Sequence, residues 1–568
     1  MTGPTAAPDV AAVTPYGPWR HPAPCDIDLS GSEGPADAVF LARTLAAAAD
    51  TGTRYPDGRG LTQSIADRLG VETARILVTA GADDALERAC RAVLAPNREA
   101  IITAPTFEML PRYVALTGAR PVTVAWHVTN NLADAIIAAA TPRTALIAIV
   151  TPNNPTGLTL SMDEIRRIHD GIPNAVLLLD LVYIEFADID ITTAALQLPR
   201  VVIARTFSKA WGLPGLRTGY AAGSAEIIGW MRAAGSPYPV AATSLAVAGA
   251  ALAERDTDVA TYIESVRSMR ARLTVLLESC GLTPETSQAN FVCVTTPRAA
   301  WLRDALAGLG VAVRLLSDDG GDRIRITCPS DETTFERVEM ALRIALKPEG
   351  ILFDLDGVLA DVSRSYRVTI RETAARFGVT LTAEDVRARK AAGNANDDWA
   401  LTTGLIQDAG KNVTLAEVTA VFEQIYQGDG TTPGLRVTET LTTTRVWLAE
   451  LAQRMPLAIV TGRPRADAER FLATNGIRDL FAAVIVQEDG PLKPDPFPVR
   501  AAMSALGISR AWMIGDTPDD VRAARAAGVL PLGIIAPEDS ATVMGPALFA
   551  AGAARIYHSI EEINACLP

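Results

Sequence analysis

The sequence has few cysteines and no cysteine pattern that binds a metal. Its six cysteines lie far apart along 568 residues, and no two of them form a Cys-X-X-Cys pair. This spacing argues against a structural zinc site and against a framework of disulfides. The cysteines are therefore expected to be reduced thiols.

The sequence also lacks a long hydrophobic run and an excess of basic residues. No apolar stretch is long enough to span a bilayer, and the N-terminal segment lacks the basic and apolar regions of a secretion signal. The net charge is -13 and the pI is near 5. Nucleic acids and anionic membranes require a basic surface that displaces counterions. The sequence therefore predicts a cytoplasmic protein without a nucleic-acid or membrane partner.

What the sequence does contain is an alternation of apolar runs and amphipathic stretches. A chain of this length is too long for one hydrophobic core. Apolar runs such as ARILVTAG and AVLLLDLVY, bounded by turn residues, are typical of buried strands in a largely parallel sheet. The sequence predicts an α/β protein with an N-terminal arm (1–38) that is loose over about its first 25 residues, a large domain (39–240), a small α+β domain (241–347) and a second α/β domain (350–568) with a helical insertion at about 361–444.

The segment TFSKAWGLPGLRTGY carries a set of side chains suited to one cofactor. It follows an apolar run and holds a lysine, an arginine and several hydroxyls. Pyridoxal phosphate needs an amine for its Schiff base, donors for its phosphate and an acid at its pyridine nitrogen. Lys209 can supply the amine, and Thr206 or Ser208 together with Arg217 can hold the phosphate.

Segments upstream of Lys209 can supply the remaining contacts. Asp180 in AVLLLDLVY can keep the pyridine nitrogen protonated. Asn154 in TPNNPTG can bond the phenolic O3′ together with Tyr183, and Phe107 can stack on the ring. A strand-to-helix turn further upstream presents backbone N–H groups that suit a phosphate. The residues of this turn are Gly81, Ala82 and Asp83.

In this order and spacing, the motifs SKxxGLxGLRxGY, NNPTG and DxxY resemble fold-type I aminotransferases of the histidinol-phosphate aminotransferase branch. The resemblance covers about Asp26 to Leu346. It implies a homodimer in which Tyr55 of RYPDG reaches the cofactor phosphate of the neighbouring protomer. It also implies that Arg325 binds a carboxylate of an amino donor such as glutamate, that Asn290 lies near the pocket wall, and that Lys209 is the general base.

Two motifs depart from the pattern of that family. The sequence SEGP stands at Ser32 to Pro35 where the family has NENP, and Phe107 stands where the family has a ring-stacking tyrosine. The N-terminal arm of the family helps to cover the substrate. The identity of the amino acceptor is therefore left open by the sequence.

A second set of chemical groups begins with the apolar run ILFDLDGVL. Its carboxylates, Asp354 and Asp356, are two residues apart and therefore point the same way at the end of a strand. Such paired acids repel one another unless a cation is present. Asp354, Asp516 and the backbone carbonyl of Asp356 can hold Mg²⁺, which prefers oxygen ligands, with Asp520 as a further ligand. The later segments of the set are IVTGRP with Thr461, LKPDP with Lys493, and IGDTPDD with Asp516 and Asp520.

These four motifs resemble the haloacid dehalogenase superfamily over about Gly350 to Pro568. The resemblance implies that Asp354 is the nucleophile, that Asp356 is first an acid and then a base, and that Thr461 and Lys493 bind the phosphoryl group. Asp356 favours a phosphatase over a dehalogenase, because an alkoxide leaving group must be protonated. Phosphoryl transfer otherwise needs mainly positioning and neutralised charge.

The helical insertion resembles the cap of this superfamily, which closes over small substrates and excludes water. Four polar residues in it are candidates to contact the substrate: Arg364, Arg367, Lys390 and Asn394. We expect each of them, taken singly, to lie on a solvated helical face instead.

The two domains together predict two consecutive steps on small molecules. The first step would convert a phosphorylated carbonyl compound into a phosphorylated amine, and the second would remove the phosphate. The pair that the resemblance favours is imidazole acetol phosphate plus glutamate to histidinol phosphate, then histidinol. Three alternatives remain: dihydroxyacetone phosphate converted to serinol, a phospho-amino-acid decarboxylase or lyase in the first domain, and a regulatory protein with relic sites.

Overall fold

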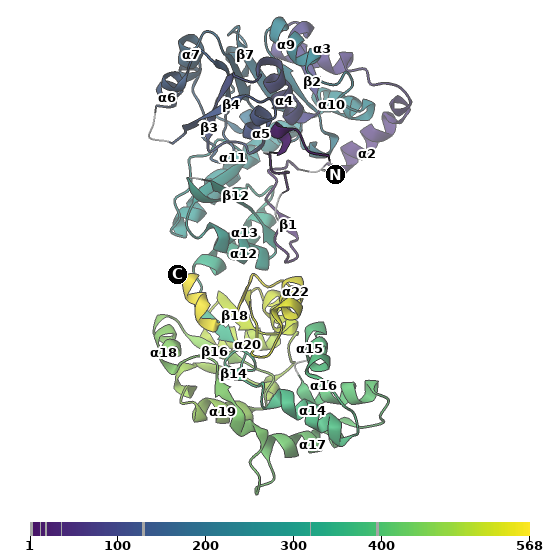
Figure 1. Ribbon diagram of the computed structural model, residues 1–568, viewed down its shortest axis with the longest axis vertical. Coiled ribbons are helices and arrows are strands. Elements are labelled where there is room, and N and C mark those ends of the chain that lie inside the picture. The colour runs from purple at the N-terminus through teal and green to yellow at the C-terminus, as the bar shows by residue number, and fades with distance from the viewer. Residues whose placement is uncertain are drawn as a thin grey trace. The chain divides into compact units, whose positions relative to one another are not determined.

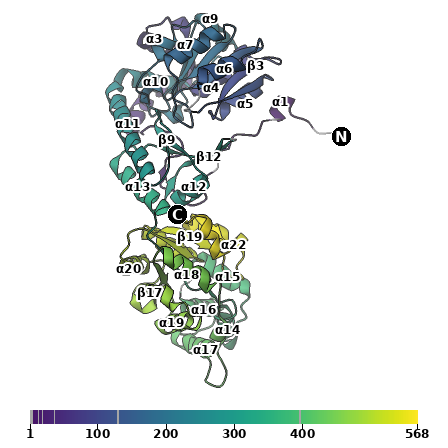
Figure 2. The same ribbon diagram turned by 90° about the vertical axis from the view of Figure 1, so that its left-hand side faces the viewer.

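The computed structural model describes residues 4–11, 13–17, 20–35, 37–127, 131–318, 320–393 and 397–568. The chain forms two compact units, which are drawn in Figures 1 and 2. None of the described helices is both long and apolar enough to cross a membrane. The first unit comprises Met1–Pro18, Leu29–Ala299 and Arg314–Phe335, and the second comprises Trp19–Asp28, Ala300–Val313 and Glu336–Pro568.

A seven-stranded sheet forms the centre of the first unit (Figure 1). In spatial order its strands are β2 (Ile76–Thr79), β8 (Gly219–Ala222), β7 (Val201–Thr206), β6 (Val176–Asp180), β5 (Thr144–Val150), β3 (Glu99–Ala104) and β4 (Arg120–Ala125). Strand β8 runs antiparallel to β2 and β7, and the other pairs are parallel. Every residue of β6 and β7 is buried. Such continuous burial explains why these strands are apolar runs rather than alternating patterns.

Helices pack on this sheet, and several begin at a polar residue that caps the first turn. Ser161 forms a capping box with Glu164 at the start of one helix, and Ser224 caps another. Such caps satisfy backbone N–H groups that have no partner within the helix. The main helices of this part are α2 (Ala38–Ala47), α3 (Arg59–Leu69), α4 (Gly81–Val93), α5 (Met109–Ala115), α6 (Leu132–Ala139), α7 (Met162–Gly171), α9 (Ala225–Ala233), α10 (Ala242–Glu254) and α11 (Asp256–Ser279).

The predicted small domain is divided between the two units. Its antiparallel sheet of β11 (Arg314–Asp318), β12 (Gly321–Thr327) and β9 (Phe291–Thr295) belongs to the first unit. Most of α12 (Ala299–Gly308) and α13 (Glu332–Leu346) belongs to the second unit. There the ring centroids of Trp301 and Trp512 lie 4.9 Å apart. The Trp512 indole N–H also donates to the carbonyl of Ile344 at 2.8 Å, which fixes α13 in that unit.

A six-stranded sheet, parallel throughout, forms the centre of the second unit. In spatial order its strands are β17 (Ala483–Ile485), β16 (Leu457–Val460), β13 (Gly350–Phe353), β18 (Ala511–Gly515), β19 (Leu530–Ile534) and β20 (Arg555–Tyr557). Apart from those of the insertion, the α-helices between these strands are α18 (Arg445–Arg454), α19 (Arg465–Thr474), α20 (Phe497–Leu506), α21 (Pro518–Ala526) and α22 (Ala541–Ala551).

The predicted helical insertion lies between β13 and β16 and is drawn in green in Figure 2. Its helices are α14 (Tyr366–Arg376), α15 (Ala383–Ala392), α16 (Asp398–Asp408) and α17 (Leu415–Gln427). Helices α14, α16 and α17 contact one another around Ala374, Ile406 and Val418. An antiparallel ribbon of β14 (Ala360–Asp361) and β15 (Thr440–Leu441) lies at the two ends of the insertion. We refer to the four helices as the cap.

The end of the predicted loose arm is packed. Strand β1 (Ile27–Asp28) pairs with β10 (Val311–Ala312). The ring Nε2 of His21 lies 2.9 Å from the carbonyl oxygen of Ala554, and Ala23 is buried. This part of the arm is held because its apolar and polar groups find partners within the second unit.

Candidate active sites

Lys209 and Asp180 lie at the same edge of the large sheet. Asp180 is the last residue of β6, and Lys209 follows the neighbouring parallel strand β7 by three residues. The carboxyl ends of parallel strands meet at one edge, where ligands bind in open α/β sheets. The Lys209 amine donates to the carbonyl of Gly31 at 3.1 Å and lies 5.6 Å from the ring centroid of Tyr183.

Asp180 is a buried carboxylate, and few groups around it offset its negative charge. Its side chain is 3% exposed and accepts a hydrogen bond from the Val182 N–H at 3.3 Å. Burial raises the pKa of Asp180 to about 7, with a smaller contribution in the same direction from Asp83, while Lys209 opposes the shift. A protonated ring nitrogen would provide the missing partner. The site therefore fits pyridoxal phosphate at this position.

The groups predicted to hold the phosphate gather around the start of α4. The Thr206 hydroxyl donates to the Ser208 hydroxyl at 2.9 Å, and Arg217 donates to the Asp83 carboxylate at 2.9 Å. Helix α4 begins at Gly81 without a side-chain cap, so its first-turn N–H groups are available to an anion. Gly81 has φ 76°, and a β-carbon there would lie 2.8 Å from Arg217 Nη2. The left-handed backbone at Gly81 therefore favours glycine, which also leaves room for the Arg217 side chain.

Arg325 lies on β12 and is 7% exposed. Its Nη1 donates to the side-chain oxygen of Asn154 at 2.7 Å, and its Nη2 donates to the carbonyl of Ser30 at 2.6 Å. Burial lowers the pKa of Arg325. Asn290 is fully buried, and its amide donates to the carbonyl of Ser32 at 3.2 Å. The arm thus contacts both residues that the sequence assigned to the substrate.

The arm also approaches Lys209 more closely than the sequence indicated. Besides the contact to Gly31, the backbone at Gly34 comes so near that a β-carbon there would lie 2.1 Å from the carbonyl oxygen of Lys209. The departure at SEGP was visible in the sequence, but the contact was not. The glycines on either side of Ser32 were the signal that could have indicated it.

Two more residues, Tyr55 and Phe107, were predicted to contact the cofactor. Tyr55 is not packed into the site, since its side chain is 82% exposed and its ring stacks on Tyr238 with 4.9 Å between centroids. Phe107 is partly buried and follows β3. The roles assigned to both stay predictions.

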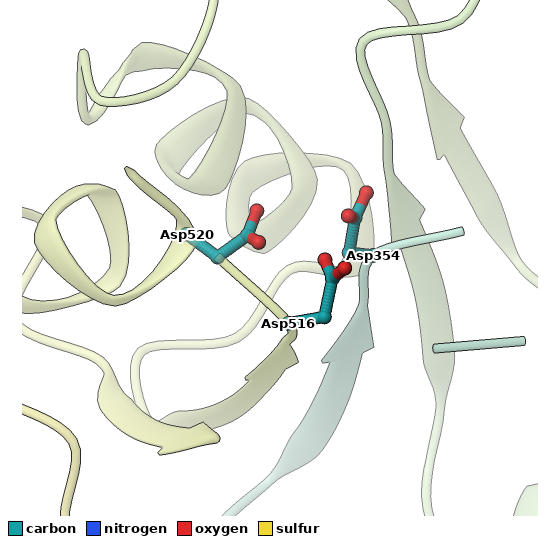
Figure 3. Close-up of side chains that lie close together, drawn as sticks. All are labelled: Asp354, Asp516 and Asp520. Atoms are coloured by element: carbon teal, nitrogen blue, oxygen red, sulfur yellow. The ribbon is translucent and has the colours of Figure 1, made fainter. Parts of the chain in front are cut away.

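Three buried carboxylates meet at the carboxyl ends of β13 and β18. Asp354 follows β13, Asp516 follows the adjacent β18, and Asp520 lies in the first turn of α21. One oxygen atom from each lies within 4.8 Å of the others (Figure 3). Gly357 has φ 74°, and a β-carbon there would lie 2.3 Å from an oxygen of Asp516. Glycine is therefore required for the loop after Asp354 to fold over Asp516.

One lysine only partly balances these three carboxylates. Lys493 Nζ lies 2.8 Å from Asp354 and 2.5 Å from Asp520, and it donates to the carbonyl of Val460. Burial, reinforced by Asp520, raises the pKa of Asp354 to about 7 and that of Asp516 well above its usual value. Crowded oxygen ligands with excess negative charge fit Mg²⁺.

Asp520 is engaged within the protein to a greater extent than its neighbours. One of its oxygens accepts hydrogen bonds from the Thr517 N–H at 3.0 Å and hydroxyl at 2.6 Å, and the other faces Lys493. Asp356 carries an ion pair with Arg463. Thr461 follows β16, is 3% exposed, and accepts a hydrogen bond from the Arg463 N–H. Asp516, Asp520 and Lys493 thus lie beside Asp354, and Asp356 is near enough to act on its charge.

Two cap residues are buried, although we expected them to lie on a solvated helical face. That prediction is wrong for both. Arg367 donates to both oxygens of Asp539 at 2.9 and 3.0 Å, and Lys390 Nζ lies 3.1 Å from Asp398. These carboxylates explain the burial, because a charge leaves water only with a partner. Arg364 is exposed as expected, and Asn394 lies outside the described residues.

Comparison with known proteins identifies both domains. Residues 26–342 match the family model described as aminotransferase class I and II. The chain belongs to this family. Residues 351–534 match the model described as haloacid dehalogenase-like hydrolase. The protein is therefore an aminotransferase fused to a haloacid dehalogenase-like hydrolase, which confirms the predicted fold class and both predicted enzyme classes.

Curated relatives of the aminotransferase cover it almost completely. A histidinol-phosphate aminotransferase of Paracoccus denitrificans is 34% identical over 321 residues, which are 55% of this chain and 87% of that protein. An aromatic amino acid aminotransferase of Rhodococcus opacus is 35% identical over 337 residues, which are 58% of this chain and 93% of that protein. The aminotransferase domain therefore resembles relatives whose names give two different substrates.

A further relative and a solved structure complete the comparison. An imidazoleglycerol-phosphate dehydratase of Phytophthora nicotianae is 49% identical over 198 residues, which are 34% of this chain and 44% of that protein. The chain thus spans less than half the length of that relative. The crystal structure of histidinol-phosphate aminotransferase from Sinorhizobium meliloti has a TM-score of 0.54 and 24% identity, covering 60% of this chain and 97% of that chain. This last likeness shows the fold.

Proposed function

We propose that the protein catalyses two consecutive reactions on one small molecule. The aminotransferase would convert a phosphorylated carbonyl compound, with imidazole acetol phosphate as the favoured candidate, into a phosphorylated amine at the expense of glutamate. The hydrolase would then remove the phosphate and release an amino alcohol such as histidinol. The observation that carries this proposal is the fusion, in one chain, of an aminotransferase of this family to a hydrolase with a buried aspartate cluster.

The residues at the first site support transamination. Pyridoxal phosphate, when bound, supplies an aldehyde and a ring that withdraws electrons from the substrate. Asp180 would bind the ring nitrogen, and Thr206, Ser208 and Arg217 would hold the phosphate. The Lys209 amine would attach the cofactor and then move the proton at the substrate Cα. Its position beside Asp180 and the ring of Tyr183 is consistent with this role.

Arg325 supports a carboxylate-bearing amino donor. Its guanidinium is buried and now donates to the neutral oxygens of Asn154 and Ser30. A buried guanidinium that has only neutral partners gains from binding a carboxylate in a bidentate fork. Glutamate would provide this carboxylate.

The residues at the second site support phosphate transfer in two steps. A carboxylate oxygen of Asp354 would form a bond to phosphorus while the bond from phosphorus to the alcohol oxygen breaks, and Asp356 would give that oxygen a proton. Water would then attack phosphorus and pass a proton to Asp356 as the bond to Asp354 breaks. Lys493, 2.8 Å from Asp354, together with Mg²⁺ bound by Asp354 and Asp516, would neutralise the charge.

The names of two of the relatives support an imidazole substrate. Two of the relatives named above act, by name, on phosphorylated imidazole compounds. Dehydration of the diol in imidazoleglycerol phosphate leaves a ketone, which is the type of group that an aminotransferase accepts. We therefore place imidazole acetol phosphate ahead of dihydroxyacetone phosphate as the acceptor.

A homodimer with shared sites accords with the exposed position of Tyr55. Its ring and that of Tyr238 form a stacked aromatic pair on the surface, with 82% and 53% exposure. Aromatic residues are enriched at protein interfaces. Tyr55 would leave this surface position to contact the cofactor phosphate of the partner protomer.

The test is a coupled assay of the complete chain with glutamate, Mg²⁺ and either imidazole acetol phosphate or dihydroxyacetone phosphate. We expect equal amounts of 2-oxoglutarate and inorganic phosphate from the imidazole compound. The Asp354→Asn variant should form 2-oxoglutarate and accumulate histidinol phosphate without releasing phosphate. If this variant accumulates no phosphorylated amine from either acceptor, the two reactions are not consecutive. Release of CO₂ from threonine phosphate would instead identify the first domain as a decarboxylase.

A further inference from the structure

Arg463 is a fully buried guanidinium beside the hydrolase site. Its side chain is 1% exposed and makes two ion pairs. On one side, Nε donates to Oδ1 of Asp356 at 2.7 Å, and Nη2 donates to the same oxygen. On the other side, Nη1 donates to Oε2 of Glu439 at 2.9 Å. Arg463 therefore joins Asp356 to a second, buried carboxylate.

Glu439 lies where the cap is connected to the parallel sheet. It follows a short 3-10 helix and directly precedes β15 of the connecting ribbon. Its Oε1 accepts hydrogen bonds from the Ser365 hydroxyl at 2.8 Å and from the Tyr426 hydroxyl at 3.0 Å. Ser365 immediately precedes α14, and Tyr426 lies in α17. Glu439 thus binds two cap helices with one oxygen and Arg463 with the other.

The contacts from the cap to Asp356 form an unbroken series of buried polar groups. The Glu439 side chain is 5% exposed, and the Arg463 guanidinium lies 5.0 Å from the ring centroid of Tyr366 on α14. Buried ions of this kind are stable only while their partners stay in place, because removal of one partner leaves an uncompensated charge. A displacement of the cap that moves Glu439 would therefore also disturb the pairing of Arg463.

Asp356 differs from the other members of the series in its exposure. Its side chain is 26% exposed, against 1% for Arg463, so Asp356 can reach a substrate and Arg463 cannot. Both hydrogen bonds from Arg463 end on Oδ1 of Asp356. The other oxygen, Oδ2, is thereby left for the proton that passes to and from the substrate.

We propose that Arg463 is a positioning residue that couples the cap to proton transfer by Asp356, with Glu439 as the connection. With the cap in the described position, Arg463 holds Asp356 in the orientation that delivers a proton to the leaving oxygen. When Glu439 is displaced, Asp356 loses that orientation. The inference rests on the proposed phosphatase function and adds to it a reason why phosphate ester cleavage requires the cap.

The test uses two phosphate esters that differ in their need for a proton. Histidinol phosphate releases an alkoxide that must be protonated, whereas 4-nitrophenyl phosphate releases a stable phenolate. In the Arg463→Gln variant of the full chain, we expect kcat for histidinol phosphate to fall on the order of 10²-fold, the lower end of the contribution of general acid catalysis. The kcat for 4-nitrophenyl phosphate should fall far less, and KM for histidinol phosphate should change little.

Further variants separate positioning from folding. Glu439→Gln keeps an acceptor for Ser365 and Tyr426 but removes the charge that holds Arg463, so it should show the same preference for the aryl ester with a smaller loss. Arg463→Lys should recover part of the activity on histidinol phosphate, because one N–H donor to Asp356 is retained. Arg445→Gln is the matched control. Arg445 is half exposed and pairs with Asp479, so both activities should stay at the wild-type level.

Specific results would overturn the proposal. Equal losses on both esters in Arg463→Gln would show a general structural role, and no loss on either would show no role. If Arg463→Gln does not fold, as judged by its melting transition and its transaminase activity, the double variant Ser365→Ala/Tyr426→Phe decides. This double variant leaves the pair of Arg463 and Asp356 intact, and it must still lose activity selectively on histidinol phosphate. Failure of the wild-type protein to hydrolyse either ester would instead refute the proposed phosphatase itself.

Discussion

The two sites of this protein both contain a buried aspartate whose pKa is raised to about 7, but they compensate that charge differently. Asp180 accepts one backbone hydrogen bond and lies near a single lysine. Asp354 belongs to a crowded set of carboxylates with Lys493 among them. In the proposed function, the first site would obtain its missing positive charge from an organic cofactor. The second would obtain it from Lys493 and a metal ion.

The largest expected effect separates the two sites completely. Lys209→Ala should abolish transamination, with a loss of at least about 10³-fold, because attachment of the cofactor and proton transfer at Cα are both lost. Hydrolysis of histidinol phosphate should be unchanged. Glutamate-dependent formation of 2-oxoglutarate and release of phosphate from added histidinol phosphate are the measurements. Lys411→Ala, at an exposed position between α16 and α17, is the control.

Removal of divalent cations should have the opposite selectivity. In EDTA, phosphatase activity should fall by roughly 10²-fold or more, because Lys493, which pairs with Asp354 and Asp520, does not balance three buried carboxylates by itself. Transamination should be retained. Titration with Mg²⁺ should restore phosphate release. A hydrolase that works equally well in EDTA would contradict the assignment of the metal site.

Asp180→Asn should lower the transaminase activity. It should also change how the stability of the folded protein depends on pH. A pKa that rises from 3.8 to about 7 on folding means that the folded state binds more protons than the unfolded state between these pH values. Stability without cofactor therefore falls as pH rises through this range, by at most about 4 kcal/mol. Asn removes this loss, and it should also lower transamination by roughly 10²-fold.

Thermal unfolding of the cofactor-free protein from pH 5 to pH 8, with Mg²⁺ present, measures the stability effect. The melting temperature of wild type should fall more steeply with pH than that of Asp180→Asn. Asp408→Asn, at an exposed position of the cap, should show the wild-type slope. If the melting temperatures of all three proteins change with pH in the same way, Asp180 does not cause the loss of stability at higher pH.

The smallest expected effect concerns the amino donor. Arg325→Lys keeps the charge but loses the planar fork that binds a carboxylate through two hydrogen bonds. We expect KM for glutamate to rise by about 10-fold, corresponding to about 1.4 kcal/mol, with a smaller change in kcat. Initial rates at varied glutamate concentration measure this. An unchanged KM would remove Arg325 from the donor site.

The positions of residues within short motifs were predictable, because such a motif holds several chemically suited side chains at a fixed spacing. Lys209 and Arg217 lie within one segment, and Asp354 follows a single apolar run. Asp180 and Asp516 were predictable for a related reason, since each ends a buried strand and parallel strands place their carboxyl ends at one edge. The sequence could therefore assign these positions before any contact was known.

The tertiary structure decided the partners that come from distant segments. Arg463 follows the predicted Thr461 by two residues, yet its pairing with Glu439 depends on how the cap connects to the sheet. The burial of Arg367 depends on Asp539, which lies 172 residues away, and the approach of the arm to Lys209 depends on Gly34. Strand periodicity and local motifs carry information over a few residues, and they determine which groups are present. Which buried charges meet is set by packing between segments, because each charge must find a partner when it leaves water.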